Sequence, residues 1–354
     1  RDNYIAGAPP TGPRWNHQIF PAFSLAMGGR YFERFDLPEA STWKQMGDQI
    51  FIGNTSNISL DEGSDYLMHV PMTNIEYGFA TGNLDFIHRT LRPSADLQIQ
   101  LMDNLGAMSG GGDTYPFGYS NAYSWGHSQV LHAASWFFED PIYQFLLERT
   151  YHGVFPGQRM TDLNNQIHRY IALPPGSEMP DEANYPRVTA SKMDEGVYAD
   201  LAASGSLEVD FEDAFHKLAF RFGFGLDDSY LSLDGLSAGA HGHQDGNTIL
   251  EYSANQRIFL TDRDYIEDMP QHHNGIVIVK DGLQPDKPPL VEVEWVGDVE
   301  GTAISRSRVP SYNGTDWERT IVGPTGSFEF VLDEMTSKED GDYLLQNLWQ
   351  SLGD

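Results

Sequence analysis

Histidines and acids are most concentrated in residues 239–247, which read Gly-Ala-His-Gly-His-Gln-Asp-Gly-Asn. If this backbone is extended, His241 and His243 point to the same side, because side chains alternate along a strand. A strand-like run ending in Asp262 comes about twenty residues later, and a histidine pair follows about ten residues beyond it. Two histidines and one aspartate with a fourth position open suit Zn²⁺. The spacing predicts a metal site, with ordinary loop histidines as the alternative.

The composition limits the partners that this chain can have. Its 354 residues carry 51 acidic and 22 basic side chains, a formal net charge of −29, and no cysteine. Such a surface repels phosphate and argues against a nucleic-acid partner. Without cysteine there is neither a disulfide framework nor thiol catalysis. No apolar stretch has the length of a membrane span, and the length predicts two domains.

The first half of the chain has helical periodicity. A helix is expected to begin near Pro13 and to stop at Gly28-Gly29, and a helix pair is expected over 84–90 and 95–106, separated by Pro93-Ser94. A further helix should start at Asp140-Pro141, a cap followed by proline in the first turn, and another should cover 161–173. These amphipathic helices should pack in pairs.

The second half reads as strands separated by turn signals. The expected strands are 217–222, 229–233, 248–252, 257–260, 276–279 and 290–296. Residues 174–205, rich in Pro, Ser and Asp, are expected to connect the halves. The sequence therefore predicts an α+β multidomain protein, with an N-terminally truncated helical domain over 1–205. An antiparallel β-sandwich domain, incomplete at its C-terminus, should cover 206–354.

Several of these residues resemble motifs of the heparinase II/III-type polysaccharide lyases, a family that includes alginate and oligo-alginate lyases. The closest match is His241-Gly242-His243-Gln244-Asp245, then a strand ending in Asp262, then His273-Asn274 opening another strand. In the first half, the segment 62–66 (Glu-Gly-Ser-Asp-Tyr) resembles the segment that carries the family's catalytic tyrosine. Trp15-Asn16-His17 resembles its Asn-His pair. The resemblance implies an incomplete (α/α) toroid followed by the β-sandwich.

The implied reaction is β-elimination at a uronate. Asn16 and His17 would neutralise the substrate carboxylate, so that the charge developing at the adjacent carbon is stabilised. Tyr66 would protonate the leaving oxygen, and would also be the base if the proton is syn to that oxygen. His241 would be the second acid–base group, since a histidine titrates near neutral pH.

The resemblance assigns His243, Asp262 and His273 as ligands of a structural Zn²⁺ that holds the β-domain loops. His272 competes with His273 for this role, and Asp264 competes with Asp262. The expected partner is an anionic polysaccharide or oligosaccharide, and the expected location is the periplasm or the outside of the cell. Two alternatives stay open: an α/α-toroid glycoside hydrolase, which would need two carboxylates flanking the bond, and a non-catalytic glycan-binding protein.

Overall fold

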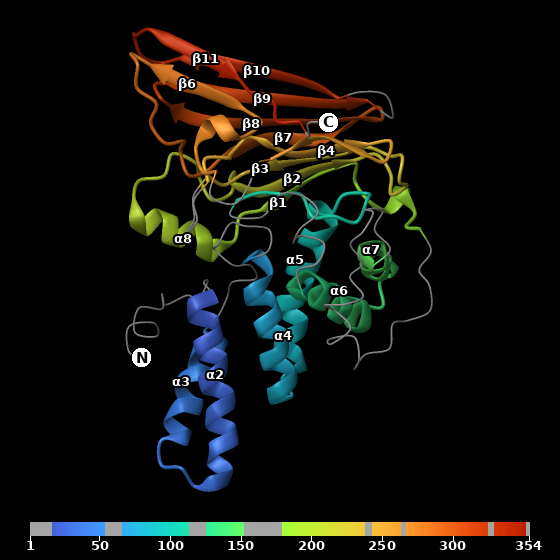
Figure 1. Ribbon diagram of the computed structural model, residues 1–354, viewed down its shortest axis with the longest axis vertical. Helices are drawn as coiled ribbons and strands as arrows, with labels where there is room; N and C mark the ends of the chain where they lie inside the picture. The colour runs from blue at the N-terminus through green and yellow to red at the C-terminus, as the bar shows by residue number, and fades with distance from the viewer. Residues whose placement is uncertain are drawn as a thin grey trace.

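The computed structural model describes residues 16–53, 66–112, 125–151, 179–237, 243–262, 267–324 and 329–351. Helices come first in the chain and antiparallel sheets follow (Figure 1). The α+β class predicted from the sequence is confirmed. None of the helices in these residues is both long and apolar enough to cross a membrane.

The helical half begins with a hairpin that projects away from the sheets (Figure 1). Its elements are α2 (Asn16–Phe32), η1 (Glu33–Phe35) and α3 (Ala40–Ile52). The stop expected at Gly28-Gly29 was wrong, because α2 continues to Phe32. The glycines serve packing instead: a Cβ on Gly29 would lie 2.4 Å from the Lys44 backbone nitrogen, and one on Gly47 would lie 2.4 Å from that of Ala26. Glycine thus allows the two helices to approach closely.

The remaining helices lie below the first sheet in Figure 1. They are η2 (Tyr66–Met68), α4 (His69–Thr81), α5 (Leu84–Leu101), α6 (Trp125–Phe138) and α7 (Pro141–Tyr151). Of these, α5 packs against β2 (Phe215–Arg221) of that sheet. The break expected at Pro93 was wrong, because α5 is one helix whose buried face, including Ile87, Leu91 and Ala95, packs into the main helical core. The start at Pro141 is confirmed, and the Asp140 side chain accepts a hydrogen bond from the Ile142 backbone at 3.2 Å. The helix expected over 161–173 lies outside the described residues.

The segment expected as a connection contains regular structure of its own. It holds η6 (Glu182–Asn184), β1 (Val188–Lys192) and α8 (Glu195–Ser204). β1 pairs with the first predicted strand, Val188 opposite Phe220, and buries Val188 in the core of the sheet half. A single buried valine in a polar stretch gave too weak a pattern to predict this edge strand. The domain boundary at 205 stays a prediction.

All six predicted strands are present, in antiparallel sheets. The first sheet has the order β1-β2-β3-β4-β5, a second has β10-β9-β8-β7, and β11 pairs with β6. The strands after β1 are β2 (Phe215–Arg221), β3 (Tyr230–Asp234), β4 (Ile249–Ala254), β5 (Arg257–Thr261), β6 (Ile276–Lys280), β7 (Glu292–Val299), β8 (Thr302–Tyr312), β9 (Thr315–Pro324), β10 (Phe330–Ser337) and β11 (Tyr343–Asn347). Side chains from β2, β3, β8 and β9 share one apolar core, which includes Leu218 and Trp317. The loops at the ends of β4, β5 and β6 carry the predicted metal site.

Candidate functional site

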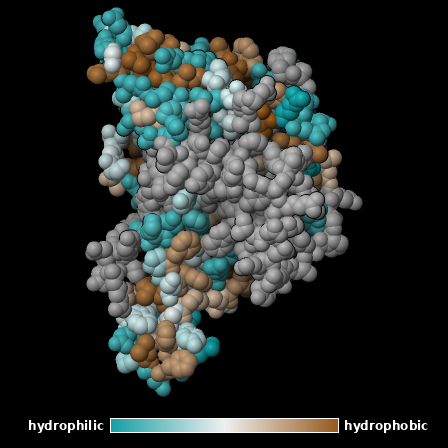
Figure 2. All heavy atoms as spheres, viewed as in Figure 1, coloured by the Kyte–Doolittle hydropathy of each residue, from teal (hydrophilic) through white to brown (hydrophobic). Residues whose placement is uncertain are grey.

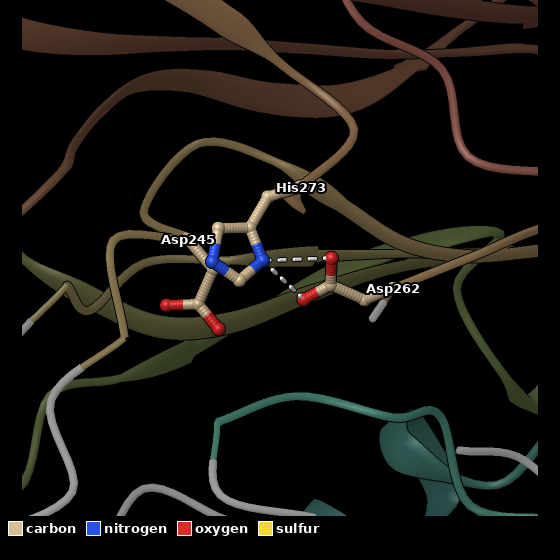
Figure 3. Close-up of side chains that lie close together, drawn as sticks. All are labelled: Asp245, Asp262 and His273. Atoms are coloured by element: carbon tan, nitrogen blue, oxygen red, sulfur yellow. Dashed lines mark hydrogen bonds and ion pairs between the residues drawn. The ribbon is translucent and has the colours of Figure 1, made fainter. Parts of the chain in front are cut away.

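A buried group of two aspartates and a histidine lies where the ends of β4, β5 and β6 meet. Asp262 directly follows β5, His273 directly follows η7 (Pro270–His272), and Asp245 lies in the loop before β4. His273 Nδ1 lies 2.9 and 3.1 Å from the two carboxylate oxygens of Asp262. One possible ligand atom from each residue falls within 4.8 Å of the other two, and none of the three side chains is more than 2% exposed (Figure 3). We call these three residues the buried acid–histidine cluster.

Backbone contacts hold the cluster in place. The Asp262 backbone N–H donates to the Leu250 carbonyl at 2.7 Å. The Asn274 side chain donates to the carbonyls of Ile249 at 2.8 Å and Thr261 at 3.1 Å, and so ties the end of β5 to β4. In the helical half, the Gly112 backbone N–H donates to Asp245 Oδ2 at 3.1 Å. The loop after α5 therefore reaches the cluster directly.

His243 lies beside the cluster. Its side chain is 2% exposed, and its ring centroid is 5.9 Å from that of His273. Three buried atoms in this group lack a hydrogen-bond partner: His243 Nδ1, Asp245 Oδ1 and His273 Nε2. Buried polar atoms are nearly always paired with protein, water or an ion. Two imidazole nitrogens and a carboxylate oxygen form a ligand set that fits Zn²⁺.

Of the two adjacent histidines, the structure places His273 in the cluster. His272 Nδ1 instead lies 2.8 Å from Glu267 Oε2, with a side chain that is 25% exposed. Asp264, the alternative to Asp262, lies outside the described residues. Asp245 was missed as a candidate ligand, although it follows His243 by two residues. In an extended segment that spacing puts both side chains on one face, so the signal was present.

Charged side chains surround the cluster. Burial alone lowers the pKa of His273, but the Asp262 carboxylate, with a contribution from Asp245, outweighs burial and leaves that pKa raised. Burial lowers the pKa of Lys287 to about 7, against the pull of Asp245. Lys217 Nζ and Asp234 Oδ2 form a buried ion pair at 2.5 Å. Burial raises the pKa of Asp234 to about 7, with Lys217 opposing and Asp245 adding to the rise. The carboxylates of Asp262 and Asp245 therefore favour positive charge at His273.

The predicted residues of the helical half lie at the starts of two helical segments, which contact each other through neighbouring rings. Asn16 and His17 form the first turn of α2, and Tyr66 begins η2. Phe20, one turn after Asn16, has its ring centroid 5.2 Å from that of His69, which lies 5.1 Å from the Tyr66 ring. These ends of α2 and α4 point toward the sheets (Figure 1).

The local environment of Tyr66 is partly apolar. Burial lowers the pKa of His69 to about 4, so that this imidazole is neutral near pH 7. Tyr66 is half-buried, and His17 is exposed. His241, the acid–base partner predicted for Tyr66, lies outside the described residues, so its position relative to the phenol stays a prediction.

Comparisons with known proteins identify solved structures with a similar architecture. No family model matches the chain, and no curated protein matches it. A crystal structure of heparinase III superposes with a TM-score of 0.62 at 14% identity, over 96% of this chain and 50% of that one. The chain has the fold of heparinase III. The heparan sulfate lyase HepC from Pedobacter heparinus superposes with a TM-score of 0.61 at 12% identity, over 97% and 48%.

The chain thus spans about half the length of these heparinase III-like structures. At 14% and 12% identity, structural similarity establishes the fold but not the activity. It confirms, for the fold, the resemblance to heparinase II/III-type lyases that the motifs predict. Function must therefore be argued from the residues, because one fold can carry several activities.

Proposed function

We propose that the protein is a polysaccharide lyase that cleaves a uronate-containing anionic glycan by β-elimination. The observation that carries this proposal is the heparinase III-like fold over nearly the whole chain, combined with the ordered His-Gly-His, Asp262 and His273-Asn274 motifs. We further propose that the helical half is an incomplete (α/α) toroid and that it faces a β-sandwich. The substrate would lie between the starts of α2 and α4 and the loops that follow the buried acid–histidine cluster.

Neutralising the substrate carboxylate is the first requirement of the reaction. The proton next to a uronate carboxylate becomes removable only when that carboxylate's charge is offset, so that negative charge can spread onto it. Asn16 and His17 would donate hydrogen bonds to its oxygens from the first turn of α2. Both side chains have some solvent exposure in the structure, which leaves them accessible to a glycan. A net charge of −29 makes such local donors necessary, since the overall field repels an anion.

Proton transfer is the second requirement. When the proton next to the carboxylate is anti to the leaving oxygen, His241 would take that proton and the Tyr66 phenol would give its own proton to the leaving oxygen. When the two are syn, Tyr66 would take the proton as a phenolate and pass it to the leaving oxygen. A phenol has an ordinary pKa of about 10, so it holds its proton at neutral pH and is suited to the acid role. The neutral His69 ring packs against Tyr66 and limits solvent on that side.

A structural zinc ion would hold the sheet loops in place. His243 and His273 are proposed to bind the ion through ring nitrogens, and Asp245 through a carboxylate oxygen. Asp262, the acidic ligand expected from the motif, contacts His273 Nδ1, so His273 would bind through Nε2 and Asp262 would orient its ring. When bound, the ion supplies charge that fixes the loop on which His241 stands.

Heparan-type glycans are the first substrates to test, because the neighbouring structures are described as heparinase III and heparan sulfate lyase. Polysaccharides do not cross membranes unaided, so we propose action in the periplasm or outside the cell. The assay incubates the protein with heparan sulfate, heparin, alginate, hyaluronan, chondroitin and glucuronan, and follows ultraviolet absorbance of the C4=C5 double bond that elimination creates.

Tyr66→Phe should abolish the absorbance gain while glycan binding persists, and Tyr31→Phe, exposed on the distal end of α2, should retain the wild-type rate. New reducing ends without absorbance would instead identify a hydrolase. Binding without either product would identify a non-catalytic glycan-binding protein.

A further inference from the structure

A cavity lies where the helical half meets the edge of the first sheet, apart from the buried acid–histidine cluster. It has a volume of about 450 Å³, is open to solvent, and is bounded by α5 on one side and by the end of β1 and the start of α8 on the other. Gln100 and Asp96 line it from α5, and His216 lines it from β2. The mechanism proposed above uses none of these residues.

His216 faces this cavity because of an irregularity in the sheet. The pairing of β1 with β2 shifts register between Ala190 and Lys192, as in a β-bulge. At this point the Ser191 hydroxyl takes the place of a backbone hydrogen-bond partner. It accepts a hydrogen bond from the Lys217 backbone N–H at 2.9 Å and donates one to the Lys217 carbonyl at 3.0 Å. A bulge redirects the neighbouring side chains. His216 consequently lines the helix-facing cavity, while Phe215 packs into the core of the sheet half.

The cavity contains polar atoms without partners. His216 is 1% exposed, and neither of its ring nitrogens has a hydrogen-bond partner. Gln100 Oε1 is likewise buried and unpaired. Burial and the nearby Lys217 charge lower the pKa of His216 well below its ordinary value, so the ring is neutral. A neutral imidazole offers one donor and one acceptor. Unpaired buried groups of this kind usually indicate a missing partner.

The charges around the cavity restrict what that partner can be. Asp96, Asp194 and Glu195 line it, against a single cation, Lys192. Asp194 already caps α8, accepting from the Gly196 and Val197 backbone at 2.9 and 3.1 Å. The Tyr143 hydroxyl donates a hydrogen bond to Asp96 Oδ1. The excess of negative charge disfavours a carboxylate or sulfate, whereas carboxylate oxygens accept readily from hydroxyl or ammonium groups.

We propose that this cavity binds a small, hydroxyl-rich ligand without negative charge, of the size of a monosaccharide, through His216 and Gln100. The volume lies within the range of small-molecule sites. The apolar side chains of Leu97, Met193 and Phe211 complete the lining and suit the C–H face of a sugar ring. The ligand is either a free sugar or an uncharged or amino-bearing unit of a glycan. It differs in charge from the uronate of the proposed reaction, so the two sites would take different ligands.

The test is a binding titration of the full chain, by ligand-observed NMR, with methyl glucoside, glucosamine and glucuronate. Methyl glucoside or glucosamine should bind saturably, and glucuronate at least tenfold more weakly. His216→Leu and Gln100→Leu should each weaken binding at least tenfold, whereas His88→Leu, on the exposed side of α5, should not change it. If His216→Leu fails to fold, sugar binding by Gln100→Leu, compared with that of the wild type, decides whether the cavity is the binding site.

Failure of all three sugars to saturate would overturn the proposal, leaving a water-filled cavity only. Equal binding of glucuronate, or binding that neither variant weakens, would also overturn it. Because the readout is binding of a monosaccharide and not cleavage of a polymer, this result is independent of the lyase assay.

Discussion

The two halves of the molecule use charge differently. In the helical half the ion pairs of Arg30 with Asp48 and Lys44 with Glu33 are part-exposed, and close packing of α2 on α3 depends on glycines. In the sheet half, Lys217–Asp234 and the Asp262–His273 contact are almost completely buried. A buried charge needs a fixed partner, whereas an exposed one is solvated by water. The buried pairs of the sheet half therefore depend on their partners in a way that the exposed pairs of the hairpin do not.

The surface of the hairpin also exposes apolar side chains. Figure 2 shows mixed hydrophilic and hydrophobic side chains over the projecting helical hairpin, at the bottom of the view. Tyr31, Phe32 and Phe35 are among its exposed aromatic residues. These exposed rings gain little from burial, so changes at them should cost little stability.

The largest expected effect comes from removing one partner of the buried ion pair. Lys217→Met leaves the Asp234 carboxylate without its cation, which should lower the free energy of unfolding by about 3–5 kcal/mol in a urea titration. The matched change in the helical half, Lys44→Met, removes an exposed pair and should cost about 0–1 kcal/mol. Equal losses in the two variants would show that the contrast between the halves is wrong.

Metal removal tests whether the buried acid–histidine cluster needs an ion. With free Zn²⁺ at a hundred times its Kd, binding should stabilise the fold by about 2.7 kcal/mol, and a chelator should remove that stabilisation. Protection of backbone amides from hydrogen exchange should fall first in β4, β5 and β6. Asp262→Asn should weaken zinc binding about 10–100-fold, as loss of a ligand-orienting group does. The idea fails if His243→Ala and His273→Ala both bind zinc as the wild type does.

Helix packing in the hairpin gives the next effect. Gly47→Ala places a Cβ within 2.4 Å of the α2 backbone, and such overpacking should cost about 1–3 kcal/mol. Gly28→Ala is the matched control, because its Cβ would meet no atom within 4 Å. That change should stabilise the helix by up to about 1 kcal/mol. Thermal unfolding distinguishes the two, and a destabilised Gly28→Ala variant would contradict the packing assignment.

Local sequence signals predicted much of the fold. The six strands and the Asp140-Pro141 start follow from alternation and capping, which are properties of neighbouring residues. The course of α2 through Gly28-Gly29 and of α5 through Pro93 depends on partners far along the chain. Gly29 is needed because of Lys44, and α5 persists because its apolar face is buried. Tertiary contacts of this kind override intrinsic helix propensity.

The candidate site was predictable to a similar degree. The motif spacing identified Asp262 and His273, which the structure brings together, and His243 beside them. It could not choose between His272 and His273, because that choice depends on which of two adjacent side chains turns inward after η7. The contact between Gly112 and Asp245 was also unpredictable, since it joins residues from different halves of the molecule.

The smallest expected effect is a pH dependence from His69. Burial holds its folded-state pKa near 4, below its ordinary value, so the unfolded chain binds a proton more readily. Its contribution to stability is therefore complete above the unfolded-state pKa and is lost as pH falls toward 4. Between pH 7 and 6 the loss should be about 0.7 kcal/mol. His69→Phe keeps an aromatic ring against Phe20 and Tyr66 but cannot titrate, so urea titrations at the two pH values should show a smaller decrease for this variant. Identical decreases in the two proteins would mean that His69 is not desolvated, and that the surroundings of Tyr66 are wetter than the structure shows.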